Sequence, residues 1–308
     1  MFAKGKNRFS GFTWKEWITF IIGLTLLITY IVVTLLEWHF RSNKVYKVFT
    51  EVQNQLDKTN ILRDHPDWQK VIYPNATLIF WGGSTYWFTF MTNVLMGVTL
   101  FLFPFYRKSN RAQRFYFASM AYIIIVVAAY WSGVGLDPKI FTDSDKFEFS
   151  KTLIMHGVAP FLGLITLFWE RKNIRISNKA VWSFSIYPMV YLLFTVAIYT
   201  FGHKFIKFGG TELDRGIVIY EVVSFLQPLG YKGGDTFLIV LFDIILVLMA
   251  FLSAPVIGFT LRKFFRILKP GQRKLKPIYF IHPTIKHEKE KQQKQKIKSK
   301  IELVKEEK

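Results

Sequence analysis

The sequence predicts an all-α fold, that of a polytopic membrane protein with about six transmembrane helices. Charged residues are sparse in six long apolar blocks and concentrate between them, as expected where hydrocarbon is the solvent. A spanning helix needs about 20 apolar residues, and the blocks approach this length. Tryptophans lie at or near the ends of the blocks, where their rings favour the headgroup layer. The predicted spans are Trp17–Trp38, Ser84–Tyr106, Phe115–Val134, Thr152–Phe168, Val181–Phe201 and Thr236–Phe259.

The first span is predicted to stay in the mature protein. Residues 1–16 are basic and precede an apolar stretch, which is also the order found in a signal peptide. The stretch is longer than the typical apolar core of about 7–15 residues, and it ends at Glu37 and Trp38 without a small-residue cleavage site. The sequence therefore predicts an uncleaved anchor with a basic cytoplasmic N-terminus at 1–16.

The spans do not resemble helices of a soluble protein, which carry one apolar stripe. Segments 20–36 and 237–249 are apolar nearly all round, so residues 17–259 are predicted to form a six-helix transmembrane domain. Its first connection, an exterior loop at about 39–83, includes a mixed-charge stretch at 44–58 that predicts a surface helix.

Basic residues gather on one side of the predicted topology. Most of the 41 lysines and arginines fall before the first span, in 107–114, in 171–179 and from 262 onward. The positive-inside rule therefore predicts that both termini are cytoplasmic, in a multi-pass protein of the cell membrane. The basic tail at 260–308 is predicted to be disordered, because its last 24 residues, Ile285–Lys308, cannot bury enough apolar surface to fold alone. It is interpreted either as a solvated tail or as a segment attracted to anionic lipids.

Composition excludes several kinds of function. The net charge of +20 would suit a nucleic-acid partner, but the positive residues follow membrane topology, so none is predicted. The absence of cysteine removes thiol chemistry and disulfides. The sequence has no phosphate-binding glycine loop, zinc spacing or dinucleotide fingerprint, so neither a metal nor an organic cofactor is expected. No inverted repeat is visible, which disfavours a transporter.

Polar side chains inside the spans are the candidate functional residues, because each costs free energy unless it faces the protein interior. Thr89 and His156 each lie about five residues into an inward-running span, roughly 7 Å below the outer boundary. Asp243 lies at roughly 12 Å in the sixth span. Helical periodicity places Thr89 and Asn93 on a polar face of the second span.

His156 is predicted to face protein rather than lipid. It shares a small and polar stripe with Ala159 and Gly163, of the kind that lets helices approach closely. Pro160 lacks the N–H that would bond the carbonyl of His156, four residues earlier, so a kink and a free acceptor are predicted there.

Two interpretations of these polar residues remain open. Thr89, Asn93 and His156 either make hydrogen bonds between helices or form a catalytic site. Asp243 has either a structural partner or the task of orienting His156.

A family resemblance bears on this choice. The run from Gly82 to Phe90, Gly-Gly-Ser-Thr-Tyr-Trp-Phe-Thr-Phe, resembles a motif of the androgen-induced and androgen-dependent family of six-span membrane proteins. The resemblance implies hydrolysis of fatty acid esters of hydroxy fatty acids, with the nucleophile at Thr89 and its histidine partner at His156. Other motifs resemble those of related bacterial membrane proteins, and the Lys-, Ile- and Phe-rich composition resembles that of a mollicute. These motifs are His156–Pro160, Trp182, Tyr187–Tyr191 and Phe225–Tyr231.

Two functional hypotheses follow. In the first, the protein is an intramembrane hydrolase of a lipid ester: Thr89 attacks an acyl carbonyl, His156 removes the proton, Asp243 holds the imidazole and Asn93 donates to the oxyanion. In the second, the protein is not an enzyme, and it binds a lipid or a partner subunit. Membrane lipids are the expected partners in both.

Overall fold

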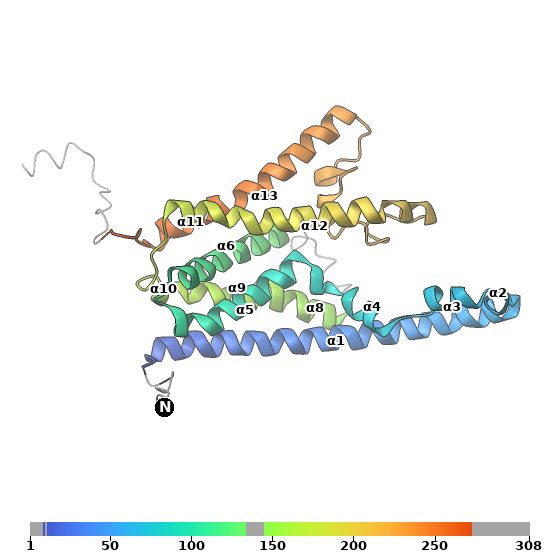
Figure 1. The fold of residues 1–308 in the computed structure, drawn as a ribbon, viewed down its shortest axis with the longest axis horizontal. Coiled ribbons are helices and arrows are strands. Elements are labelled where there is room, and N and C mark those ends of the chain that lie inside the picture. Colours follow the sequence, from blue (N-terminus) through green and yellow to red (C-terminus); the bar gives the residue numbers. More distant parts are fainter. Residues whose placement is uncertain (1–8, 10, 134–144, 273–308) are drawn as a thin grey trace, which may run out of the picture. The chain divides into compact units, whose positions relative to one another are not determined.

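The computed structural model describes residues 9, 11–133 and 145–272, and those of them up to Pro270 form one compact unit. Helices make up nearly all of the ordered secondary structure (Figure 1), and the described residues contain one isolated bridge, between Arg175 and Leu268. The predicted all-α membrane fold is confirmed, because six helical segments are long and apolar enough to cross a bilayer. They are Trp14–Thr59, Phe88–Tyr106, Asn110–Ser132, Lys146–Glu170, Asn178–Phe208 and Thr236–Phe264.

Helix α1 (Trp14–Thr59) is much longer than the predicted first span. A capping box between Thr13 and Glu16 starts it, and Asn60 ends it in the left-handed conformation with φ of 55°. The mixed-charge stretch at 44–58 is not a separate surface helix, because it continues α1. The physical reason is that the sequence between Gly23 and Pro66 contains neither glycine nor proline to interrupt the helix.

The connection after α1 folds back along that helix. It contains α2 (Ile61–Asp64), α3 (Pro66–Ile72) and α4 (Ala76–Trp81), which run beside the second half of α1 in Figure 1. The Trp38 indole donates a hydrogen bond of 3.1 Å to the carbonyl of Ala76, which fixes α4 against α1.

The second span begins at Phe88, four residues later than predicted. Ser84–Tyr86 forms a short 3-10 turn (η1), and Trp87 is extended before α5 (Phe88–Tyr106) begins. Helices α1 and α5 approach closely at Gly23, where a Cβ atom would lie 2.3 Å from the backbone nitrogen of Phe101.

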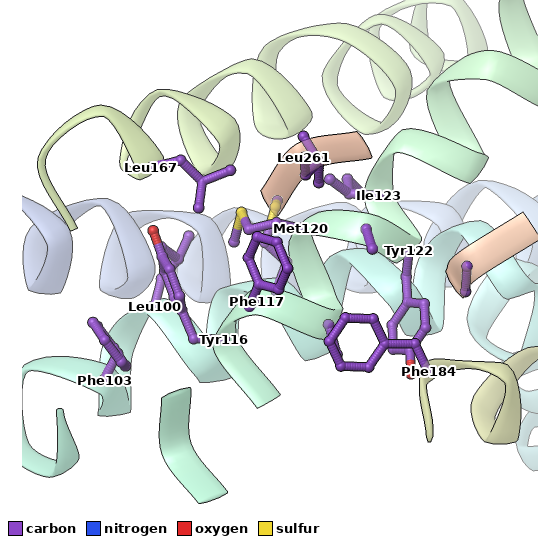
Figure 2. Packing of buried hydrophobic residues seen from close by; sticks show 14 of the residues in the cluster. Leu100, Phe103, Tyr116, Phe117, Met120, Tyr122, Ile123, Leu167, Phe184 and Leu261 are labelled. Carbon is purple, nitrogen blue, oxygen red and sulfur yellow. The ribbon is translucent and has the colours of Figure 1, made fainter. Parts of the chain in front are cut away.

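The core is built around α6 (Asn110–Ser132), because half of the residues in its most apolar window are buried. Figure 2 shows its side chains meeting those of α5, α10, the turn before α12, and α13. The labelled core residues are Leu100, Phe103, Tyr116, Phe117, Met120, Tyr122, Ile123, Leu167, Phe184 and Leu261.

The fourth span is interrupted where the sequence predicts a kink. Helix α8 (Lys146–Leu153) leads into a π-helical turn at Ile154–Val158, followed by α9 (Ala159–Ile165) and α10 (Leu167–Glu170). The predicted free acceptor is confirmed as well: the carbonyl of His156 accepts a 3.0 Å hydrogen bond from the Trp131 indole.

The fifth span comprises α11 (Asn178–Trp182), a 3-10 turn η4 (Ser183–Ser185), α12 (Ile186–Gly202) and η5 (His203–Phe208). The sixth is α13 (Thr236–Phe264), and the connection between them carries short turns at Glu221–Val223 (η6) and Pro228–Gly230 (η7). Only 11% of the most apolar window of α13 is buried, and its N-terminal half diverges from α12 in Figure 1.

The ordered chain extends beyond the predicted boundary at residue 260. Helix α13 continues to Phe264, the side chains of Phe265 and Ile267 are buried, and the N–H of Ile176 donates to the carbonyl of Leu268 at 3.0 Å. Most of the predicted disordered tail, 273–308, lies outside the described residues. The cytoplasmic placement of both termini stays a prediction.

Candidate functional site

Two buried clusters of polar side chains lie near the two ends of the helix bundle. Each contains a glutamate from α1: Glu16 is 2% exposed and Glu37 is 6% exposed. At 1.5 Å per residue, the two glutamates are about 30 Å apart along the helix. The clusters are called the Glu16 end and the Glu37 end below.

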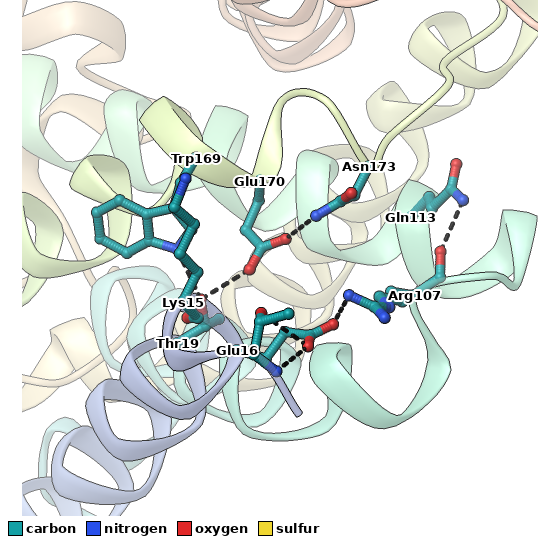
Figure 3. Close-up of polar contacts among 9 residues, drawn as sticks. Lys15, Glu16, Thr19, Arg107, Gln113, Trp169, Glu170 and Asn173 are labelled. Carbon is teal, nitrogen blue, oxygen red and sulfur yellow. Dashed lines mark hydrogen bonds and ion pairs between the residues drawn. The ribbon is translucent and has the colours of Figure 1, made fainter. Parts of the chain in front are cut away.

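The Glu16 end is a network of ion-paired and hydrogen-bonded groups (Figure 3). Glu16 forms an ion pair with Arg107, which directly follows α5. Glu170, at the end of α10, is 1% exposed and accepts hydrogen bonds of 2.9 Å from both Thr19 and Asn173. These contacts tie the starts and ends of three spans together, which is the work of a structural cluster.

At the Glu37 end, one carboxylate contacts the segments that precede both candidate catalytic residues. Glu37 accepts hydrogen bonds from the N–H of Ser84, at 3.1 Å, and from its hydroxyl. It also pairs with the ammonium of Lys151 at 3.4 Å. Ser84 precedes Thr89 by five residues, and Lys151 precedes His156 by five. Glu37 therefore links the turn before α5 to α8.

Thr89 lies in the first turn of α5, rather than one and a half turns into the helix as predicted. Its N–H donates to the phenol oxygen of Tyr220 at 3.3 Å, and its hydroxyl lies 3.4 Å from the same oxygen. The N–H of Phe88 donates to the phenol oxygen of Tyr191 at 2.9 Å. Two tyrosines thus satisfy the first N–H groups of the helix, which have no partner within it.

His156 lies in the π-helical turn and is half-buried. Its ring stacks on Tyr130 of α6 with 3.9 Å between the ring centroids. Its Nδ1 lies 3.0 Å from the carbonyl oxygen of Thr152. A carbonyl only accepts hydrogen bonds, so Nδ1 carries the hydrogen, and in the neutral ring Nε2 carries the lone pair.

Asn93 connects the turns of the two candidate residues. It is fully buried, and its Nδ2 donates to the carbonyl of Thr89 at 2.9 Å and to that of Met155 at 3.1 Å. Its Oδ1 accepts a 3.1 Å hydrogen bond from the Tyr30 hydroxyl. Both amide hydrogens are therefore engaged, and in this arrangement none is left for the predicted oxyanion.

Asp243 lies apart from these residues, on α13. It is half-buried and close enough to the Tyr199 hydroxyl to interact with it electrostatically. Among the described residues, no hydrogen bond or ion pair joins Asp243 to His156, whose Nδ1 is taken by Thr152. The structure thus brings together the turns of Thr89, Asn93 and His156, but not Asp243.

Sequence reasoning did not assign a role to the tyrosines around the start of α5. Tyr187 and Tyr191 are four residues apart on one face of α12, a spacing that could have revealed them, and Tyr187 lies 3.2 Å from the Thr92 hydroxyl. Tyr220 comes from the connection between α12 and α13, and no pattern in the sequence marks it. Burial raises the pKa of the Tyr220 phenol, so the group stays neutral at physiological pH.

Within the described parts of the chain, no three His, Asp or Glu side chains are close enough together to hold a metal ion. The absence of any cofactor stays a prediction.

Comparison with known proteins shows a weak similarity to a mycoplasma protein. No protein-family model matches the chain, and no solved structure matches it. An uncharacterised protein of Mycoplasma genitalium is 24% identical over 164 residues, which cover 47% of this chain and 63% of that protein. This chain thus matches less than two thirds of the length of its relative. The similarity agrees with the expected mollicute-like relatives but gives no support to the androgen-induced family. The protein is, by its six apolar helices, a multi-pass integral membrane protein.

Proposed function

We propose that the protein is a membrane-embedded lipid ester hydrolase, with the Thr89 hydroxyl as nucleophile and the His156 imidazole as general base. The observation that carries the proposal is the position of Asn93. Its amide bonds the carbonyls of Thr89 and Met155, so the first turn of α5 is fixed against the π-helical turn of His156. Such π-helical turns occur frequently at functional sites.

The hydrogen bonding of His156 supports its role as a base. The Thr152 carbonyl at 3.0 Å holds Nδ1 and leaves Nε2 to accept a proton, the arrangement that activates a hydroxyl nucleophile in hydrolytic triads. The orienting task first expected of Asp243 thereby passes to a backbone carbonyl. The Thr89 hydroxyl contacts Tyr220 in the free protein, and catalytic hydrogen bonds commonly tighten only when substrate binds.

The reaction divides into two steps. In the first, Thr89 Oγ1 bonds to the acyl carbon while Nε2 of His156 takes the hydroxyl proton, and the leaving alkoxide receives that proton as the ester bond breaks. In the second, Nε2 takes a proton from water, which attacks the acyl-threonine. As the bond between the acyl carbon and Thr89 Oγ1 breaks, Nε2 returns the proton to Oγ1 and the fatty acid leaves. The substrate class follows from location, because a site between membrane spans meets lipid acyl chains.

A fluorophosphonate probe tests the nucleophile directly, since it forms a covalent bond with an activated hydroxyl. Purified wild-type protein in detergent is expected to be labelled, and Thr89→Ala is expected to be spared. Thr92→Ala is the matched control: it lies on the same helix, and its hydroxyl contacts Tyr187 instead. Equal labelling of wild type and Thr89→Ala would overturn the assignment.

The second candidate is a non-enzymatic membrane protein that binds a lipid or a partner subunit. It is favoured by the complete hydrogen bonding of Asn93, which is typical of polar packing between helices. In this case Thr89→Ala and His156→Ala lower the melting temperature in detergent, and purified wild type hydrolyses no ester. This candidate would be rejected if wild type hydrolyses the ester and the two variants lose that activity while they keep the melting temperature of wild type.

A further inference from the structure

The phenol of Tyr220 contacts Thr89, the candidate nucleophile, and the proposed reaction gives Tyr220 no role. Its phenol oxygen lies 3.4 Å from Thr89 Oγ1 and accepts the Thr89 N–H at 3.3 Å. The residue belongs to the connection between α12 and α13, so a segment distant in sequence places one hydroxyl at the start of α5.

We propose that Tyr220 is a third catalytic residue, whose hydroxyl donates a hydrogen bond to the oxyanion that forms when Thr89 attacks an ester. This inference rests on the proposed hydrolase activity. It names the group that stabilises the negative charge, which that proposal leaves unassigned.

The position of the phenol fits this task. When Thr89 Oγ1 bonds to the acyl carbon, the electron pair of the carbonyl moves to its oxygen, which is attached to the same carbon. That oxygen forms beside Oγ1, within reach of a phenol that already contacts Oγ1. Donors placed where charge develops are the main source of stabilisation in such reactions.

The backbone supplies a second donor at the same place. The Thr89 N–H now donates to the Tyr220 oxygen, so when the phenol turns to donate to an oxyanion beside it, this N–H is released to the same oxyanion. The N–H lies at the start of a 19-residue helix, where the helix dipole favours negative charge. A phenol and a backbone N–H together form a two-donor oxyanion site.

Competing donors are already engaged. Both amide hydrogens of Asn93 bond to backbone carbonyls, and the Tyr191 hydroxyl donates to the carbonyl of Tyr86 at 3.3 Å. Burial keeps the Tyr220 phenol neutral, because it raises the pKa of that group, so its proton is available to donate.

The test compares Tyr220→Phe with Tyr187→Phe in the full-length protein, using a p-nitrophenyl ester of a fatty acid in detergent micelles. Tyr220→Phe removes one hydroxyl and keeps the ring that packs on Trp87 at 5.9 Å. We expect kcat to fall about 10²- to 10³-fold with little change in KM, as for loss of one oxyanion donor. Tyr187→Phe is expected to retain kcat.

A purely structural role as a helix cap predicts a different result. Tyr220→Phe would then lower the melting temperature, and kcat per folded molecule would equal that of wild type, which overturns the inference. The outcome for Thr89→Ala separates this failure from that of the hydrolase itself. If Thr89→Ala is inactive while Tyr220→Phe keeps full kcat, only the role of Tyr220 is wrong. If Thr89→Ala keeps full kcat, the hydrolase proposal fails and takes this inference with it.

Discussion

The Glu16 end and the Glu37 end are built on the same helix from the same kind of residue, yet their polar groups are satisfied to different degrees. At the Glu16 end, Oε1 of Glu16 accepts no hydrogen bond within the described chain, but it forms the ion pair with Arg107, and Glu170 accepts two hydrogen bonds. At the Glu37 end, two buried oxygens have no hydrogen-bond partner within the described chain: the hydroxyls of Thr85 and Tyr130.

The unpartnered groups lie beside the candidate catalytic residues. Thr85 precedes Thr89 by four residues, and Tyr130 stacks on His156. Native proteins pair nearly all buried polar groups, and exceptions concentrate where a ligand or a reaction uses them. The comparison teaches that both buried carboxylates have an ion-pair partner, whereas the hydroxyls without a partner lie beside the candidate residues.

The largest effect is expected for a substitution of the proposed nucleophile, near the Glu37 end. Thr89→Ala removes the proposed nucleophile and is expected to lower kcat for a p-nitrophenyl fatty acid ester by at least about 10³-fold, as losses within catalytic triads do. Its melting temperature should stay near that of wild type because the hydroxyl has one long contact. A kcat equal to that of wild type would show that Thr89 is not the nucleophile, and the Glu37 end would then have no catalytic role.

The next prediction contrasts two glutamates directly. Glu37→Gln weakens the carboxylate contacts to Ser84 and Lys151, so the turns of the nucleophile and base lose their common anchor. Because small misplacements of catalytic groups cost up to about 10²-fold, we expect kcat to fall roughly 10- to 100-fold. Glu170→Gln, the matched change at the other end, is expected to lower only the melting temperature. Equal kcat values for the two variants would contradict the contrast.

A third prediction concerns the close contact between α1 and α5 at Gly23, which lies between the two glutamates in the sequence. Gly23→Ala places a methyl group 2.3 Å from the backbone nitrogen of Phe101, so α1 and α5 must separate. Such overpacking costs about 1–3 kcal/mol, which thermal or denaturant unfolding in detergent would measure. Gly11→Ala is the control, because its Cβ meets nothing within 4 Å. Identical stability of both variants would show that the close contact of α1 and α5 is unimportant.

The smallest effect is expected at the kink. Trp131→Phe removes the indole donor and leaves the carbonyl of His156 without that hydrogen bond. Losing such a bond costs about 1–2 kcal/mol, and the reaction rate should change less than for Glu37→Gln. Circular dichroism during thermal unfolding measures the loss. Unchanged stability would mean that water or another donor replaces the indole.

The sequence was sufficient where local chemistry decides the structure. Six apolar windows predicted six spans, and the missing N–H of Pro160 predicted the free carbonyl of His156. Its donor, Trp131, was not predictable, because that contact depends on how α6 packs against the fourth span. The mixed-charge stretch at 44–58 is a largely exposed helix, as predicted, but its continuity with the first span was missed because its composition is polar, although nothing in it breaks a helix.

The candidate site was predictable only in part. Thr89, Asn93 and His156 stood out as polar residues within apolar windows, but Thr89 lies in the first turn of α5 because Ser84–Tyr86 forms a separate 3-10 turn before it. Glu37 lies at the end of an apolar window, where a carboxylate is expected to face the headgroups or water and so does not indicate a buried contact. Tyr220 depends on the conformation of a long connection, and periodicity carries no information about such a segment.

Helix α1 has a mechanical consequence. Its 46 residues correspond to a rod of about 70 Å, which is more than twice the thickness of a bilayer's hydrocarbon core, about 30 Å. Without glycine or proline after Gly23 the rod has no hinge, and α2–α4 are folded back against its far half. We expect a displacement of that half to move Glu37 as well, and with it the residues that Glu37 contacts ahead of Thr89 and His156.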